Sequence, residues 1–486
     1  TVVIDAEQRT VLPGFIDSHF HLVLGSLRLA DLTLSSVQNL DELRASLQSA
    51  KTENGWIVGR SLRHEILAPS QALTRQLLDE AVAHLPVIVF ASDGHIAWAN
   101  TLALRQAKIL SPVPAVANGE IISDANAHAT GELREFGAFS KVLELVPVLN
   151  QSAQRALVQR GIALALQCGI TSVHNMDGNA ERIALYAAME AAGEMTLRIY
   201  VPYDIKPETP LDAISEAVAW KAQYQGSHVR AGAVKLFMDG VLESTTALMV
   251  DDYAGLPGNR GSALYSAEHF NRVAAEADRL GLQIFVHCCG DGAVRRTLDG
   301  YAYARQVNET PAAPRDSRHR VEHIEVIHPA DIARFAALGV IASMQPLHSP
   351  ITGSEGEVWL DRAGQARWPL SFAWETLRQA GAHLAWGSDW PVVSLDPMLG
   401  FYAARNRQPW VPLHPRQQQR IEDVIAGYTR DAAYAEFQEQ RKGMIRVGML
   451  ADLVLFSGDL FITSPAAITS VRPTLTVCDG RIVFRA

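Results

Sequence analysis

The chain has 486 residues, of which 48% are hydrophobic and 20% are charged, and its formal net charge at pH 7 is -9. This is a globular composition, long enough for one large domain with an accessory domain. No Lys/Arg block with interleaved aromatic residues is present that could follow a phosphate backbone. We therefore expect no nucleic-acid partner.

Cysteine usage and the hydropathy pattern point to a chain that stays in a reducing compartment. There are four cysteines, without CxxC spacing, and the vicinal pair Cys288-Cys289 is poorly suited to a structural disulfide. No apolar run reaches the roughly 18 residues of a membrane span, and no basic start leads into an apolar signal region. We expect a cytoplasmic protein with no membrane partner. The chain begins at Thr1 in a strand-like run without Met. We therefore keep open the interpretation that an upstream segment was removed or omitted.

Short apolar runs bounded by Gly, Pro or polar residues recur along the chain, with helical segments between them. In chain order they cover residues 14–21, 85–95, 169–176, 197–204, 233–240, 282–291, 320–325, 340–346 and 383–391. Nearly continuous apolar strands are typical of parallel sheets buried on both faces. The intervening segments have helical periodicity, as in residues 266–281, which begin with a Ser able to cap a helix and end at a Gly.

Eight or nine such strand–helix alternations are enough for an α/β fold of the (β/α)8 TIM-like barrel type, with polar residues at the C-terminal ends of its strands. The sequence predicts this barrel over residues 13–434. Residues 23–150 are too long for one crossover, so they are expected to contain an insertion that acts as a lid. Residues 443–458 and 470–484 alternate in strand fashion around a turn at Asp479-Gly480. With the chain start, they predict a small β domain from residues 1–12 plus 435–486.

Two histidines one residue apart close the motif LPGFIDSHFHL, residues 12–22. On a strand His19 and His21 point the same way, about 6.6 Å apart at the backbone. Two imidazoles can then reach one ion at about 2.0–2.1 Å each, although a hydrogen-bonded histidine pair is the other interpretation. Further candidates follow other strands, namely Lys235, His287, His323 and Asp389. Four histidines and an acid favour a metal centre for Zn²⁺, Mn²⁺ or Fe²⁺.

With these motifs the sequence resembles the amidohydrolase superfamily of metal-dependent hydrolases, and within it the YtcJ-like branch that includes N-substituted formamide deformylases. The resemblance covers essentially the whole chain. It is carried by LPGFIDSHFHL, VKLFMDGVLESTTA, VEHIEVIHPADIARFAALGVIASMQP and WGSDWPV. It implies a metallo-hydrolase barrel with a small β-sandwich built from both chain ends, of which the upstream strands are expected to be missing here.

The resemblance also implies a role for each candidate. His19 and His21 would bind the buried metal, and a carboxylated Lys235 would bridge two divalent ions, expected to be Zn²⁺. His287 and His323 would bind the second ion, and Asp389 would be both ligand and general base. An unmodified lysine is an ammonium with a pKa of about 10.4 and cannot bind metal. A single metal, with Lys235 in an ion pair with a carboxylate such as that of Asp239, is therefore the alternative.

Substrate-binding roles are expected for six residues near the strand ends and in the insertion. These are His95, Trp98, Asp239, Asp291, Gln345 and Trp390. For His95 a surface or capping role is an equal alternative, and for the aromatic residues packing is the alternative. His174 could orient a neighbour or touch the substrate.

The expected reaction is hydrolysis of an amide, such as an N-substituted formamide, or of a related ester, by a metal-activated water with Asp389 as base. The substrate would be a small, partly hydrophobic molecule, and a homodimer is left open. The first alternative is a mononuclear deaminase, but His287 is followed by Cys-Cys-Gly instead of the HxxE pattern. The second is a non-enzymatic barrel scaffold, which predicts gaps in the ligand set, and none of the six positions is missing.

Overall fold

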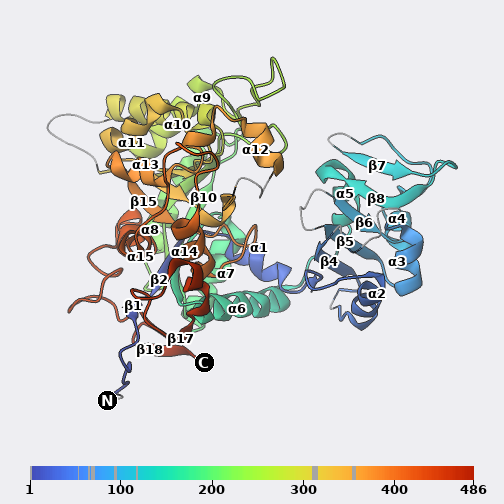
Figure 1. Ribbon diagram of the computed structural model, residues 1–486, viewed down its shortest axis with the longest axis horizontal. Coiled ribbons are helices and arrows are strands. Elements are labelled where there is room, and N and C mark those ends of the chain that lie inside the picture. The colour runs from blue at the N-terminus through green and yellow to red at the C-terminus, as the bar shows by residue number, and fades with distance from the viewer. Residues whose placement is uncertain are drawn as a thin grey trace. The chain divides into compact units, whose positions relative to one another are not determined.

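The computed structural model describes residues 3–52, 54–63, 66, 72–91, 96–116, 119–308, 316–352 and 357–486. The chain forms two compact units (Figure 1). One unit is Val23–Arg160, and the other combines Thr1–Leu22 with Gly161–Ala486. Among the described residues, no helix is long and apolar enough to cross a membrane.

Eight parallel strands form the barrel of the larger unit, in the order β15-β14-β13-β12-β11-β10-β9-β2. They are β2 (Phe15–Phe20), β9 (Ile170–Asn175), β10 (Arg198–Asp204), β11 (Val229–Phe237), β12 (Gln283–Cys288), β13 (Arg320–His323), β14 (Ile341–Met344) and β15 (His383–Trp386). Almost every residue of these strands is buried, as expected for a sheet covered on one face and filled on the other. The predicted (β/α)8 barrel is confirmed.

The barrel closes where the end of the last strand meets β2. Phe20 and Trp390 form a parallel bridge, and the Asp389 amide donates to the His19 carbonyl at 2.7 Å. Gly387 allows this approach, because a Cβ at that position would lie 2.5 Å from the His19 nitrogen. Closure therefore brings the motif WGSDW against the first histidine pair.

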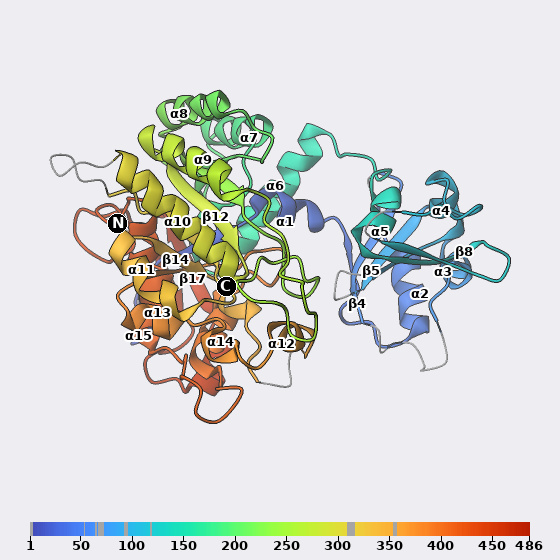
Figure 2. The ribbon, with the colours of Figure 1, turned by 90° about the horizontal axis from the view of Figure 1, so that it is seen from above.

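Helices cover the outside of the barrel, and Figure 2 shows α9 and α10 lying along the outside of β12. The main ones are α7 (Ala180–Ala191), α8 (Ile214–Gln223), α9 (Ala267–Arg279), α10 (Asp291–Asn308), α11 (Ile332–Leu338), α12 (Glu357–Ala363), α13 (Trp374–Gln379), α14 (Pro397–Asn406), α15 (Ile421–Gly427) and α16 (Arg430–Ala435). The predicted cap of α9 is confirmed: the Ser266 side chain accepts a hydrogen bond from the His269 amide at 3.2 Å.

Both chain ends meet in one antiparallel four-stranded sheet, β1-β16-β17-β18. Its strands are β1 (Val11–Pro13), β16 (Leu453–Phe456), β17 (Pro473–Cys478) and β18 (Arg481–Arg485). The predicted hairpin turn is present at Asp479 and Gly480, both with positive φ. The sheet is fixed to the barrel by a buried bidentate pair, in which Arg198 donates to both oxygens of Asp452 at 2.8 and 3.0 Å.

The smaller unit, Val23–Arg160, has its own mixed six-stranded sheet in the order β3-β4-β5-β6-β8-β7. The strands are β3 (Leu32–Thr33), β4 (Ile57–Leu62), β5 (Val87–Ala91), β6 (Ile96–Ala99), β7 (Glu120–Ser123) and β8 (Ala129–Arg134). Helices α2 (Leu40–Ser49), α3 (Arg75–Ala81), α4 (Thr101–Gln106) and α5 (Glu135–Leu143) accompany it, and α1 (Leu22–Arg28) and α6 (Gln151–Gln167) contain the boundaries to the larger unit.

One expected barrel strand belongs to this smaller unit. Within the apolar run at 85–95, Val87–Ala91 forms β5, which is buried and paired with β4 and β6, and residues 92–95 lie outside the described residues. A strand buried in any sheet has the same apolar pattern, so the sequence could not separate it from the barrel strands. The lid role of residues 23–150 stays a prediction.

Candidate metal centre

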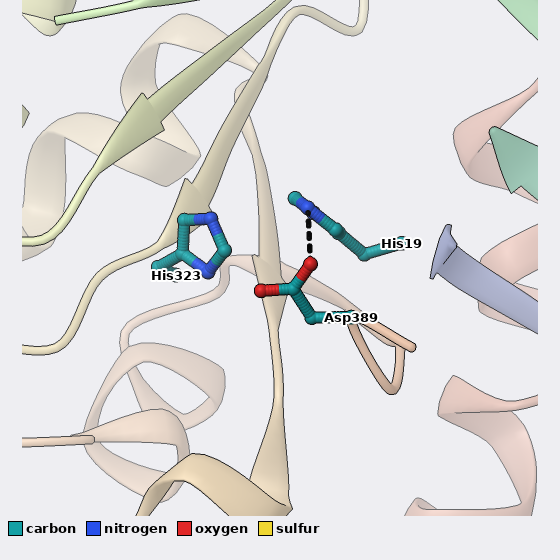
Figure 3. A group of neighbouring side chains, drawn as sticks. All are labelled: His19, His323 and Asp389. Atoms are coloured by element: carbon teal, nitrogen blue, oxygen red, sulfur yellow. Dashed lines mark ion pairs between the residues drawn. The ribbon is translucent and has the colours of Figure 1, made fainter. Parts of the chain in front are cut away.

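Three buried side chains converge at the C-terminal mouth of the barrel (Figure 3). His19 lies on β2, His323 ends β13, and Asp389 follows β15. One ligand atom from each of these residues lies within 4.8 Å of the others. The His19 Nε2 is 3.4 Å from the Asp389 Oδ1, and the His19 and His323 ring centres are 4.6 Å apart. Three strands distant in sequence thus direct ligand-type atoms to one point.

His21 joins this group through the same carboxylate. Its Nε2 lies 3.1 Å from the Asp389 Oδ1, and its Nδ1 lies 3.0 Å from the Asp177 Oδ1. Burial lowers the pKa of His21, but hydrogen bonds to Asp177 and Asp389 outweigh it and raise the pKa to about 9. In the metal-free protein this imidazole is a proton-carrying bridge, so a metal ion would compete with that proton.

The other nitrogen of His19 is held from inside the barrel. Its Nδ1 lies 2.7 Å from the Glu322 Oε2, and Glu322 accepts two hydrogen bonds from Arg320 at 2.8 and 3.0 Å. Burial lowers the pKa of His19 to about 4, so the ring is neutral at neutral pH. The Glu322 carboxylate therefore accepts a hydrogen bond from the Nδ1–H of the neutral ring, and the Nε2 lone pair is directed at Asp389.

His287, His323 and His348 form a second row of rings beside the first. The ring centres of His287 and His323 are 4.5 Å apart, and those of His323 and His348 are 5.8 Å apart with nearly parallel planes. The His348 Nε2 lies 3.6 Å from the Asp389 Oδ2. Burial and the neighbouring His287 hold the pKa of His323 well below the usual range. Burial also lowers the pKa of His348, so the rings of His323 and His348 can present uncharged nitrogen.

Lys235 is almost completely buried on β11, with 2% of its surface exposed. Its Nζ lies over the Phe237 ring, 4.0 Å from the centroid. Among the described residues no carboxylate oxygen lies within ion-pair distance of it, and burial lowers its pKa. The structure therefore does not show the ion pair between Lys235 and Asp239 that was the alternative. The Asp239 carboxylate accepts hydrogen bonds from backbone amides instead.

Asp389 and His323 have unusual backbone conformations. Their φ angles are +62° and +74°, in the left-handed region that side chains other than glycine rarely adopt. Such conformations cost of order 1–3 kcal/mol each and persist where surrounding contacts hold them. Burial alone would raise the pKa of Asp389, but His19 and His21 hold it well below the usual range. The carboxylate is thus ionised and held in a strained position among the histidines.

The two other acidic candidates mainly organise loops. Asp239 accepts hydrogen bonds from the amides of Leu248, Cys289 and Gly290 at 2.9, 3.1 and 2.9 Å. Asp291 begins α10 and accepts from the Val250 amide at 2.8 Å. The Asp239 Oδ1 also lies 3.3 Å from the His287 Nδ1, so Asp239 is an outer partner of that histidine. The expected contact of Asp239 and Asp291 with substrate stays a prediction.

The remaining substrate-binding candidates lie in different surroundings. Gln345 follows β14 with 2% exposure, and neither side-chain atom has a hydrogen-bond partner among the described residues. Trp390 packs on Phe20, with ring centres 5.0 Å apart. Trp98 is buried in the hydrophobic core of the smaller unit, which favours the packing alternative. His95 lies outside the described residues.

His174 takes the orienting role and lies inside the barrel. It is completely buried, with its Nδ1 2.7 Å from an Arg320 nitrogen and its Nε2 3.2 Å from the Glu436 Oε1. It therefore helps to hold Arg320, which in turn holds Glu322. This chain of contacts leads from the barrel interior to His19.

Sequence reasoning missed three residues of this group. Glu322 directly precedes His323, and strict strand alternation would send the two side chains to opposite faces. The left-handed backbone at His323 breaks that alternation. Asp177 lies in the loop after β9, and His348 ends the short 3-10 helix Pro346–His348 after β14. Both segments are too short for a periodic pattern. Their one sequence signal was position after a barrel strand, which Asp177 shares with Asp389.

The donor set fits a divalent metal ion. Imidazole nitrogens with a carboxylate suit Zn²⁺, Mn²⁺ and Fe²⁺. The Nδ1 of His323 is a buried polar atom with no hydrogen-bond partner among the described residues, as expected for an atom that awaits a ligand. The Nδ1 contacts of His19 and His21 to carboxylates are the outer partners that metal-binding histidines usually have.

A (β/α)8 barrel with histidines and an aspartate at its C-terminal mouth has the arrangement of a barrel enzyme, because the active sites of such enzymes lie at that face. The chain belongs to the Amidohydrolase family, whose sequence model matches residues 2–484. It is 28% identical over 494 residues to the putative amidohydrolase YtcJ of Bacillus subtilis, covering 98% of this chain and 89% of the relative. It is 24% identical over 501 residues to N-substituted formamide deformylase of Arthrobacter pascens, with the same coverage. The resemblance found in the sequence is confirmed.

The fold agrees with a solved structure. An uncharacterized metal-dependent hydrolase from Pyrococcus horikoshii superimposes with a TM-score of 0.76 at 24% identity, covering 95% of this chain and 89% of that one. This likeness supports the architecture, barrel and terminal sheet together. Family membership makes the protein a hydrolase.

Proposed function

We propose that this protein is a metal-dependent hydrolase that cleaves the C–N bond of a small N-substituted amide or the related bond of an ester. The observation that carries the proposal is the buried group of His19, His323 and Asp389, whose ligand-type atoms lie within 4.8 Å of one another at the barrel mouth. The similarity to a formamide deformylase supports the amide.

The proposed ligands are His19, His21 and Asp389 for one ion and His287 and His323 for a second, with carboxylated Lys235 between them. Zn²⁺ is the proposed metal, and Mn²⁺ and Fe²⁺ suit the same donors. Such ions, when bound, would polarise the scissile carbonyl and make the attacking water more acidic. Carboxylation needs a neutral amine that attacks CO2 with loss of a proton, and the burial of Lys235 lowers its pKa in that direction.

Asp389 is the proposed general base. Its Oδ1 faces His19 and His21, whereas its Oδ2 lies 3.6 Å from His348. Oδ2 can therefore take the proton of the attacking water and deliver it to the leaving amine or alcohol. Glu322 keeps the His19 ring fixed during this transfer, because it accepts from Nδ1 at 2.7 Å.

The aromatic ring of Phe237, which lies next to His287, supports a partly hydrophobic substrate. The Phe237 ring stacks on the His287 ring with centres 5.0 Å apart, and 43% of Phe237 is exposed. An exposed aromatic ring in contact with a proposed ligand offers apolar surface to a bound substituent.

The test is a substrate panel for protein purified without chelator: an N-benzylformamide, the matching acetamide, the matching ester and an aminoheterocycle. We expect the protein to hydrolyse the amides to the amine and the carboxylate. This activity should be lost after metal removal and restored by Zn²⁺. Ammonia from the aminoheterocycle alone would instead establish the deaminase alternative. No turnover of any compound by metal-loaded protein would favour the scaffold.

A further inference from the structure

A glutamine at the barrel mouth has no partner for either end of its side chain. Gln345 follows β14 and has 2% of its surface exposed, and neither its Oε1 nor its Nε2 has a hydrogen-bond partner among the described residues. A buried carboxamide without partners costs free energy, because it has lost its hydrogen bonds to water and has formed none in exchange. One donor and one acceptor are therefore available to a ligand.

Other glutamines buried in the larger unit are hydrogen-bonded. Gln417 is buried to the same extent, and its Oε1 accepts from the Glu375 amide at 2.8 Å while its Nε2 donates to the Thr376 Oγ1 at 2.9 Å. The Gln283 Nε2 donates to two backbone carbonyls at 2.6 and 2.7 Å. The open carboxamide of Gln345 is thus particular to the barrel mouth.

The strand pattern directs the Gln345 side chain into the barrel mouth. Ser343, two residues earlier, accepts a hydrogen bond inside the barrel from Arg320 at 2.8 Å. The Gln345 backbone is extended, with φ -121° and ψ 100°. Its side chain therefore lies on the same face of the sheet as that of Ser343, one layer nearer the mouth. This is the face that holds the metal ligands.

Gln345 lies between the strands that lead to His323 and Asp389, whose side chains face each other (Figure 3). His323 in β13 comes one residue before the level of Gln345. After β15, the Gly387 amide donates to the carbonyl of the residue before Gln345 at 3.1 Å. The Gln345 carbonyl accepts from the His348 amide at 3.1 Å, and the His348 ring lies 3.6 Å from Asp389. The carboxamide is thus part of the wall around a substrate held at the metal centre.

We propose that Gln345 selects secondary amides, with its Oε1 accepting the N–H of the scissile bond and its Nε2 donating to the carbonyl oxygen. In the cis form of a secondary amide the N–H and the C=O lie on the same side, so one carboxamide can pair with both. An ester has no N–H, and the Gln345 Oε1 then stays buried without a partner. Sites built to bind a substrate N–H discriminate strongly against analogues that lack it. This inference rests on the proposed hydrolase function and names its substrate class.

The test compares N-benzylformamide with benzyl formate, which differ by NH against O at the scissile bond. Both are given to metal-loaded wild type, Gln345→Met and Gln417→Met. Methionine keeps the length of the side chain and removes both polar ends. In Gln345→Met, kcat/KM for the amide should fall about 10–100-fold, because the substrate N–H is left unpaired, and kcat/KM for the ester should stay within about 3-fold. In Gln417→Met the ratio of the two values should stay at the wild-type level.

Thermal unfolding separates this selectivity from a structural role. Gln345 has no partner to lose, so Gln345→Met should unfold at the wild-type temperature or above it. Gln417→Met loses its bonds to Glu375 and Thr376 and should unfold at a lower temperature. A decrease in Gln345→Met as large as that in Gln417→Met would overturn the assignment of an open carboxamide.

The kinetic outcomes distinguish the two proposals. An equal fall of kcat/KM for amide and ester in Gln345→Met would overturn the role of Gln345 in selectivity and leave the hydrolase proposal standing. Wild-type protein that hydrolyses benzyl formate but not N-benzylformamide would also overturn it. Failure of metal-loaded wild type to hydrolyse any compound of the panel would overturn both proposals.

Discussion

Replacing Asp389 by Asn is expected to lower kcat about 10²–10⁴-fold, the usual contribution of a positioned general base. The amide keeps the size of the side chain and an oxygen facing His19 and His21, but it cannot take a proton from water. The histidines remain, so the variant should still bind metal. Steady-state kinetics on the best compound of the panel measures the loss of kcat. Metal content measured on the same preparation shows whether the variant still binds metal.

Asp396→Asn is the matched control for that variant. Asp396 lies on the same segment and caps α14 by accepting from the Met398 amide at 2.9 Å. Asn caps helices about as well as Asp, so both turnover and stability should stay near wild type. Wild-type turnover in Asp389→Asn would refute its role as base and direct attention to His348, 3.6 Å away.

Replacing Glu322 by Gln is expected to damage both stability and metal binding. The carboxylate is completely buried between Arg320 and His19, and breaking such a pair typically costs about 3–5 kcal/mol because a charge is left buried. Loss of an outer partner of a metal-binding histidine typically lowers metal affinity about 10–100-fold. Denaturant unfolding and chelator competition measure the two effects.

The stability effect has a defined pH dependence. Burial would raise the pKa of Glu322, but Arg320 and His19 lower it to about 2. A carboxylate with a depressed pKa stabilises the fold above its unfolded pKa of about 4.3, and this contribution fades as pH falls from there toward 2. The wild-type advantage over Glu322→Gln should thus be constant between pH 7 and 5 and shrink below about pH 4.

Glu439→Gln serves as the control for Glu322→Gln. Glu439 accepts hydrogen bonds from Arg318 at 3.1 and 3.0 Å, a similar two-point contact, but its side chain is 25% exposed. Water compensates an exposed charge, so this loss should cost about 0–1 kcal/mol and leave metal affinity unchanged. Equal effects of the two substitutions would show that the buried pair has no special role for His19.

Much of the fold follows from local pattern. Apolar runs such as 283–288 are buried strands, Ser266 caps α9, and Asp479-Gly480 makes the terminal hairpin. The local pattern cannot predict which sheet a strand joins. The sequence of β5 has the pattern of a barrel strand, but β5 belongs to the sheet of the smaller unit. Membership depends on long-range pairing, which residue periodicity does not encode.

The residues of the site also include some that the local sequence pattern predicts and some that it does not. His19, His21, His323 and Asp389 could be predicted, because they lie at strand ends and parallel strand ends meet at one edge. The structure brings these four together, and places His287 beside His323. Glu322 and His348 could not be predicted. Glu322 points to the site because the next residue, His323, has a left-handed backbone, and His348 lies in a short 3-10 helix without a periodic pattern.

The most direct measurement is metal content by elemental analysis of protein purified without chelator, repeated on Lys235→Ala. We expect about two divalent ions per chain in the wild type and a clear loss in the variant, because a carboxylated lysine would bridge them. One ion, unchanged in the variant, would contradict the binuclear centre and support a mononuclear site at His19, His323 and Asp389. No bound metal, with none taken up on addition of Zn²⁺, would contradict the metal-dependent hydrolase itself.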